Sequence, residues 1–305
     1  MGIYERDYKT SKFTDNLQRN ALVQLIIINL VIFVLFQFVH VFYLFSFTGD
    51  AKGKFMHDVY MNLALPASFS EFIQKPWTLV THMFYHHDIW HILGNMLWLW
   101  MFGYLFHDLT GNKQIIPLFI YSALGGAIAF MLAYNFFPNL DVNANMIGAS
   151  GGIMGIVVAT TILAPGYRIF PMISGGIPLW VITTVYLIID LALMPVSNTG
   201  GHIAHLAGGF TGFLFVISMR RGWDWSIGIN RFFDWVNNLF NPGKPQKKTK
   251  DQLFYKSKRK PYMKSPNLSQ QRVDEILDKI NMHGFNSLTA EEKELLKKAS
   301  KEDLK

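Results

Sequence analysis

The feature that most constrains this chain is a series of long apolar stretches with almost no charge. Ala21–Phe47 contains about 27 residues without Asp, Glu, Lys or Arg, which exceeds the roughly 20 residues that a helix needs to cross a bilayer. Five further stretches follow, at about 89–106, 115–137, 147–165, 177–194 and 202–219. Only helices and closed barrels satisfy their backbone groups in lipid. We therefore predict an all-α polytopic membrane protein with six transmembrane helices.

Composition supports a membrane protein and restricts its chemistry. Half of the residues are hydrophobic and 16% are charged, whereas about a quarter of a soluble domain is charged. The first stretch is too long for the core of a secretion signal, so we expect a retained anchor. The chain has no cysteine, which excludes a disulfide framework, a thiolate zinc cage and a thiol nucleophile.

The positive charge is concentrated after the last apolar stretch. Residues 241–264 hold nine Lys or Arg and one Asp, whereas the connections 138–146 and 195–201 hold no Lys or Arg. By the positive-inside rule we expect both termini in the cytoplasm and the basic segment against anionic lipid. We expect no nucleic-acid partner, because aromatic platforms and a folded basic face are missing.

Composition also predicts the organisation of the chain. Residues 1–20 form a polar cytoplasmic leader, and residues 21–221 a six-helix membrane domain with a long first outer loop. Residues 222–240 are rich in Trp and Phe, which is typical of an interfacial helix. Residues 241–267 form a basic linker, and 268–305 a small cytoplasmic helical hairpin.

Signals for helix ends define that hairpin. Ser269 is the expected cap of the first helix and Gly284 its stop. Thr289 and Glu292 form the capping box of the second helix.

Polar side chains occur near the outer ends of three predicted spans. His91 and Asn95 are one turn apart at the start of the second span, and Ser150 opens the fourth within the sequence GASGGIMG. His202 and His205 are one turn apart at the start of the sixth. Polar groups within spans are costly and tend to be functional, so their shared depth suggests that they meet.

These residue types suit nucleophilic acyl transfer. A serine hydroxyl needs an adjacent base, usually His, and the tetrahedral intermediate needs preorganised donors. Histidine and asparagine one turn apart are suitable donors, together with the Ser150 backbone N–H at a helix start. The patterns Gly151-x-x-x-Gly155 and Gly208-x-x-x-Gly212 would let two spans approach closely.

Other interpretations of these residues remain open at this point. Taken singly, Ser150 could serve close helix packing, and His91 with Asn95 could join two helices. The histidines near the outer edge could bind zinc, but no intramembrane H-E-x-x-H motif is present, so we expect neither a metal nor a cofactor. A transporter would place paired broken helices and charges at the midplane, and this cluster lies nearer one face.

Taken together, the motifs resemble those of the rhomboid family of intramembrane serine proteases over most of residues 21–221. They are W77-x-x-x-T81-H82, His86, H91-x-x-x-N95, G148-A-S-G151 and A204-H205-L-A-G208. The resemblance implies that Ser150 is the nucleophile and His205 the general base, a dyad without the acid of soluble serine proteases.

The same resemblance assigns the surrounding residues. His91, Asn95 and the Ser150 backbone correspond to the oxyanion donors. Supporting roles fall to His86 and Trp77, and to the glycines of the two motifs, Gly148, Gly151 and Gly208. The resemblance also implies transmembrane protein substrates and, because six spans are the bacterial-type arrangement, a location in the bacterial inner membrane.

Three points depart from the family pattern or compete with it. Thr78 follows Trp77 where Arg is common, and His107 beside Asp108 stands where an acid is usual. His202 is the competing base, but only His205 lies in the A-H-x-x-G motif. For Asp190 we expect a structural role rather than assistance to His205.

A non-catalytic rhomboid-like protein that binds membrane clients is the alternative function.

Overall fold

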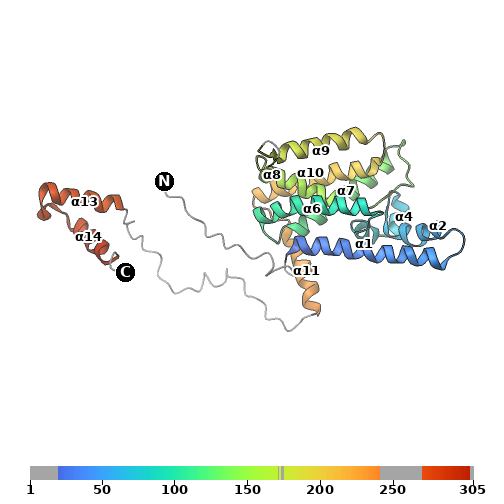
Figure 1. Cartoon of the computed structure of the whole chain (residues 1–305), viewed down its shortest axis with the longest axis horizontal. Coiled ribbons are helices and arrows are strands. Elements are labelled where there is room, and N and C mark those ends of the chain that lie inside the picture. Colours follow the sequence, from blue (N-terminus) through green and yellow to red (C-terminus); the bar gives the residue numbers. More distant parts are fainter. Residues whose placement is uncertain (1–19, 171, 173–174, 241–269, 303–305) are drawn as a thin grey trace. The chain divides into compact units, whose positions relative to one another are not determined.

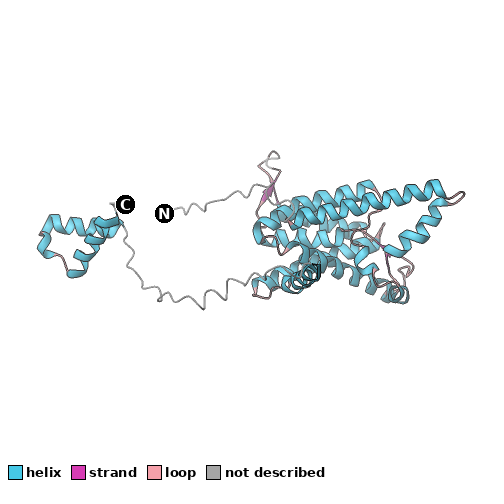
Figure 2. Ribbon diagram, turned by 90° about the horizontal axis from the view of Figure 1, so that it is seen from below, coloured by secondary structure: helices cyan, strands magenta, loops and turns pink. Residues whose placement is uncertain are grey.

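The computed structural model describes residues 20–170, 172, 175–240 and 270–302. The chain divides into two compact units, Met1–Pro242 and Gly243–Lys305. Most of the first unit is helical, with short paired strands in its loops (Figure 2). This architecture confirms the predicted all-α membrane protein.

Each predicted span contains one long helix in the described part of the chain (Figure 1). The helices are α1 (Ala21–Ser46), α6 (Ile89–Thr110), α7 (Ile115–Phe136), α8 (Ser150–Leu163), α9 (Leu179–Leu193) and α10 (Thr199–Arg220). Four of them, α1, α6, α7 and α10, are long and apolar enough to cross a membrane. Helices α8 and α9 have 14 and 15 residues, so they are shorter than the predicted stretches 147–165 and 177–194.

Helix α8 lies at the centre of the bundle and α1 at its edge. Most of α8 is buried, and it contacts α6, α7, α9 and α10. Helix α1 contacts α6 and α7 and exposes large apolar side chains such as Phe38 and Phe45. In Figure 1, α1 and α9 lie on opposite sides of the bundle. Exposed apolar side chains are the surface expected of helices that face lipid.

Glycines bring α8 and α10 into backbone contact. A Cβ atom added to Gly208 would overlap the carbonyl oxygen of Gly151, and one added to Gly212 would overlap that of Gly155. A Cβ atom on Gly151 would lie 3.5 Å from the carbonyl oxygen of Ala204. The small-residue patterns therefore pack against each other as the sequence predicted.

Gly208→Ala is expected to destabilise the bundle by about 1–3 kcal/mol, because the added methyl meets backbone that cannot rotate away. The matched control is Gly94→Ala on α6, where an added Cβ has no atom within 4 Å, so the change is expected to be neutral or slightly stabilising. Thermal unfolding in detergent measures both. Equal midpoints for the two variants would contradict this packing.

The predicted long outer loop is a compact series of short elements. It contains α2 (Ala51–Phe55), η2 (Met56–Tyr60), α3 (Met61–Leu63), β1 (Leu65–Pro66), α4 (Phe69–Gln74) and α5 (Thr78–Thr81). Strand β1 pairs antiparallel with β2 (Asn145–Met146), with Leu65 opposite Met146. A second pair, β3 (Arg168–Ile169) with β4 (Ile177–Pro178), joins α8 to α9. The first pair therefore links the loop to the segment before Ser150.

The predicted interfacial segment 222–240 contains helix α11 (Ser226–Phe240). Its start is anchored on the bundle, because the Tyr121 hydroxyl donates to the Trp225 carbonyl at 3.2 Å. Several large apolar side chains of α11 are exposed, Phe232 and Trp235 among them. A partly anchored helix with exposed aromatic residues agrees with an interfacial position, which stays a prediction.

The second unit contains the predicted hairpin. Helix α13 (Gln270–His283), the turn η3 (Phe285–Ser287) and helix α14 (Ala290–Glu302) follow one another. Glu292 Oε2 accepts from the Thr289 N–H at 2.7 Å, and Thr289 Oγ1 accepts from the Glu292 N–H at 3.3 Å. This is the predicted capping box, and Gly284 follows α13 with a φ of 78°. The leader 1–19, the linker 241–267 and Ser269 lie outside the described residues.

Candidate active site

Ser150 is the first residue of α8, and the segment before it is fixed on both sides. Strand β2 pairs with β1, and the Gly148 N–H donates to the His82 carbonyl at 2.8 Å. Gly148 has a φ of 110°, a conformation that only glycine adopts readily. The chain therefore turns sharply at Gly148, and helix α8 begins at Ser150, three residues into the predicted stretch 147–165.

His91 lies directly against this turn. A Cβ atom on Gly148 would lie 2.8 Å from His91 Nε2 and 3.7 Å from Ser150 Oγ. His91 itself is held at the start of α6, where its backbone N–H and that of Trp90 donate to Asp88 Oδ1, both at 2.9 Å. The imidazole of His91 and the hydroxyl of Ser150 thus border the same small space beside Gly148.

Two more polar side chains near His91 each have one buried atom without a partner. Asn95 follows His91 by one turn and is 9% exposed. The ring of His86 lies 5.1 Å from the ring of His91. Among the described residues, neither Asn95 Nδ2 nor His86 Nε2 has a hydrogen-bond partner. Buried polar groups are rarely left unpaired, so these atoms are available to a bound molecule or to water.

His205 reaches the same region from α10. Its neighbours Ala204 and Gly208 both contact Gly151, the residue after Ser150. No hydrogen bond joins Ser150 Oγ to His205 in the described part of the chain, although the sequence suggested one. The backbone contacts nevertheless place Ser150 and His205 at the same depth on two helices that face each other.

Asp190 of α9 contacts both histidines of α10. Its Oδ1 accepts from His202 Nδ1 at 2.7 Å and from His205 Nδ1 at 3.0 Å. Asp190 is 2% exposed, and its Oδ2 has no partner among the described residues. The structure therefore adds an acid beside His205, which the resemblance did not imply.

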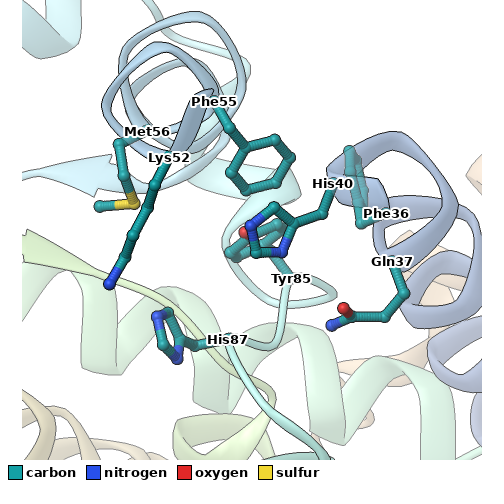
Figure 3. Close-up of a pocket in the computed structure, with 8 residues that line it drawn as sticks. All are labelled: Phe36, Gln37, His40, Lys52, Phe55, Met56, Tyr85 and His87. Atoms are coloured by element: carbon teal, nitrogen blue, oxygen red, sulfur yellow. The ribbon is translucent and has the colours of Figure 1, made fainter. Parts of the chain in front are cut away.

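The same three side chains are the one group in the described residues that could hold a metal ion. One ligand atom from each of Asp190, His202 and His205 lies within 4.8 Å of the other two. The remaining histidines of the outer segment do not join this group. His87 instead lines a separate pocket between α1 and the first loop, where it lies opposite Lys52 (Figure 3).

The first loop supports the site from the other side. The Trp77 indole donates to the Asn62 carbonyl at 2.8 Å, and the Thr81 hydroxyl to the Leu63 carbonyl at 2.8 Å. These bonds fix the residues just before β1, which pairs with β2. Trp77 is half exposed, so its contribution is to the loop rather than to the space beside Ser150.

His82 connects this loop to the site and is buried as a neutral side chain. Its Nδ1–H donates to the Thr78 carbonyl at 2.8 Å. Burial lowers the pKa of His82 to about 4 and that of His86 to about 4. Both imidazoles are therefore uncharged at neutral pH, so their hydrogen bonds are those of the neutral ring.

Acid is expected to destabilise the protein through His82. In the unfolded chain His82 takes up a proton below about pH 6.5, whereas the folded form resists it down to about pH 4. The free energy of unfolding therefore has its full value above pH 6.5. It falls by up to about 3 kcal/mol as the pH drops towards 4. His82→Asn keeps a donor for Thr78 and should reduce this fall in thermal unfolding, leaving the part that His86 contributes. His57→Asn, at an exposed position, should leave it unchanged; an equal effect would contradict the assignment.

Two regions of the chain match known protein families. Residues 74–222 match the rhomboid domain family. The chain therefore contains a match to the rhomboid domain over just under half of its length. Residues 261–302, which include the hairpin, match a family of unknown function (DUF6576).

The rhomboid domain is also similar to curated proteins at modest identity. It is 29% identical over 149 residues to Rhomboid protease GlpG of Yersinia pestis (strain Pestoides F), covering 47% of this chain and 50% of that protein. It is 26% identical over 149 residues to Rhomboid protein 1, mitochondrial, of Saccharomyces cerevisiae, covering 48% and 42%. The matches thus span half or less of the length of these relatives.

Proposed function

We propose that this chain is an intramembrane serine endopeptidase that cleaves transmembrane or juxtamembrane segments of other membrane proteins. The observation that carries the proposal is the glycine contact between α8 and α10. It brings Ser150, at the start of one helix, to the level of His205 on the other. The match of residues 74–222 to the rhomboid domain, and the similarity to a rhomboid protease, support an intramembrane protease at the family level.

The proposed reaction uses Ser150 and His205 in turn. His205 Nε2 takes the hydroxyl proton as Ser150 Oγ attacks the carbonyl carbon of the substrate peptide. The resulting oxyanion accepts hydrogen bonds from the His91 imidazole, the Asn95 amide and the Ser150 backbone N–H. His205 then gives the proton to the leaving nitrogen, and the C–N bond breaks. Water, deprotonated by His205, cleaves the acyl ester and restores the hydroxyl.

The unpartnered atoms near His91 support this role for the donors. Asn95 Nδ2 is buried without a partner, which suits a donor reserved for a charge that appears only during the reaction. The position of His91 Nε2 beside Gly148 and Ser150 supports the same assignment. Gly148 then keeps a side chain out of the space beside His91 and Ser150 that the substrate carbonyl would occupy, whereas Gly151 allows the contact with α10.

We propose that the substrate reaches this site laterally from the lipid, past α9. Only Leu179, Thr183 and Asp190 of α9 are buried, so this helix packs through one narrow stripe. A transmembrane substrate must unwind to expose a peptide bond. Substrates with Gly or other helix-weakening residues near the cleavage site are therefore expected to be preferred.

The orientation follows from charge. We propose that both termini are in the cytoplasm and that residues 241–264 lie against anionic lipid, because that segment alone carries about +8. A bacterial inner membrane is proposed from the six-span resemblance alone. The site at the opposite end of the bundle would then open towards the outside, which supplies the water that hydrolysis needs.

Removal of residues 243–305 is expected to leave the cleavage rate within about threefold of the full chain, because the site lies wholly in the first unit. The measurement compares kcat in neutral detergent, where anionic lipid has no part. A truncated protein that folds with the parent's thermal midpoint but cleaves nothing would show that the tail is required for catalysis.

The alternative is a rhomboid-like protein that binds membrane clients without cutting them. Purified protein reconstituted with a fluorescent transmembrane reporter distinguishes the two functions. Appearance of two fragments that increase with time supports the protease. Stable co-purification with an intact reporter, across several helix-weakened sequences, supports the binding protein.

A further inference from the structure

A single carboxylate oxygen at the site serves two imidazoles. Asp190 Oδ1 accepts from His202 Nδ1 at 2.7 Å and from His205 Nδ1 at 3.0 Å. The histidines project from consecutive turns of α10, whereas Asp190 comes from α9. Side-chain exposure is 2% for Asp190, 11% for His202 and 13% for His205, so water screens this cluster little.

The hydrogen bonds determine where each imidazole carries its hydrogen. An ionised carboxylate only accepts, so both Nδ1 atoms must be protonated to bond it. A neutral imidazole with hydrogen on Nδ1 has its lone pair on Nε2. His205 Nε2 is the atom that the proposed reaction needs as a base. The position of Asp190 therefore selects the productive form of His205.

We propose that Asp190 is a positioning residue that orients His205 with its Nε2 lone pair towards Ser150, and that His202 is the second donor that holds Asp190 in place. This proposal rests on the proposed protease function. Burying a carboxylate costs free energy unless several hydrogen-bond donors satisfy it. His205 donates one hydrogen bond to Asp190, and His202 donates the second. Asp190 would also stabilise the imidazolium that forms when His205 takes the serine proton.

The surroundings favour these two histidines as its partners. The other titratable groups that face His205 are Tyr186 of α9, with ring centroids 6.2 Å apart, and His91 of α6. Tyr186 is on the same helix as Asp190, one turn away, but its ring packs on Trp98 at 4.7 Å. In the described residues no Lys or Arg forms an ion pair with Asp190.

The first test reads the tautomer of His205 directly and requires no activity. Histidine labelled with ¹³C and ¹⁵N, in reconstituted protein, gives ring shifts that distinguish hydrogen on Nδ1 from hydrogen on Nε2, and His205→Asn assigns the signal. We expect hydrogen on Nδ1 in the parent. In Asp190→Asn the amide can donate to Nδ1, so the hydrogen is expected to move to Nε2. A parent with hydrogen on Nε2 would overturn the proposal.

The second test measures the rate at which a fluorophosphonate probe labels Ser150 as a function of pH. Asp190→Asn is expected to lower the plateau rate at least about tenfold and to move the acid midpoint to lower pH. His202→Ala leaves His205 as the sole partner of the carboxylate and should move the midpoint to higher pH. His202→Asn, which keeps a donor near Nδ1, should recover most of that change. Shifts in one direction for both variants would overturn the proposal.

The two tests separate this proposal from the protease function. Hydrogen on Nδ1 in a parent that never reacts with the probe would leave the tautomer assignment intact and end the protease function. Metal analysis tests whether Asp190, His202 and His205 bind a metal ion instead. One zinc ion per chain, retained during purification and lost in Asp190→Asn, would overturn the proposal, because the metal would then replace hydrogen on both Nδ1 atoms.

Discussion

Ser150→Ala is expected to lower kcat for cleavage of a transmembrane reporter by at least about 10⁴-fold. In serine proteases, removal of the nucleophile leaves only the rate enhancement from binding and the oxyanion donors. The substitution should not affect folding, because Ser150 Oγ makes no hydrogen bond to another described residue. Binding of the reporter should therefore persist while the fragments disappear.

The matched control for this experiment is Ser122→Ala. Ser122 is also a buried serine of a membrane helix, and its Oγ has no partner among the described residues. It lies on α7 beside Gly155, one turn from the site along α8. We expect its alanine variant to cleave within about twofold of the parent, since losing an unpaired hydroxyl has little cost. Cleavage by Ser150→Ala at the parent's rate would contradict the mechanism.

The second large decrease in kcat is expected when His205 is substituted and not when His202 is substituted. His205→Asn and His202→Asn both keep a side-chain N–H close to the position of Nδ1, so Asp190 keeps a donor in each case. Asparagine cannot accept the serine proton. His205→Asn should therefore lower kcat by about 10⁴-fold, whereas His202→Asn should lower it by less than about tenfold.

This pair of variants also tests the choice between the two histidines. They share Asp190 Oδ1 and lie one turn apart, with ring centroids 6.0 Å from each other. The reverse order of effects, with His202→Asn the more damaging, would make His202 the base. Reporter cleavage at saturating substrate, with thermal midpoints measured on the same samples, provides the comparison.

The sequence predicted the fold because the fold depends on local pattern, and the same kind of pattern grouped the residues of the candidate site. Each apolar stretch was found as a helix, since lipid permits little else. The glycine patterns around Gly151 and Gly208 predicted which two helices approach closely. One-turn spacing placed His91 near Asn95 and His202 near His205. The capping box at Thr289 was predicted correctly because its signal lies within four residues.

Other features depend on contacts between distant segments, which no spacing reveals. The sequence identified Asp190 as an acid within a span, but not that one of its oxygens faces both His202 and His205. Nothing in the sequence showed that the Gly148 N–H donates to the His82 carbonyl. The turn at Gly148 also explains why α8 begins later than its apolar stretch, because Asn145 and Met146, before the turn, pair with the first loop instead of forming helix.

The most direct test of the central claim is to locate a covalent adduct. Purified protein is treated with a fluorophosphonate, digested, and mapped by mass spectrometry. We expect one adduct per chain on Ser150, absent in Ser150→Ala and strongly reduced in His205→Asn. Modification of another serine at the same rate, or an unmodified Ser150 in protein that still cleaves the reporter, would contradict it.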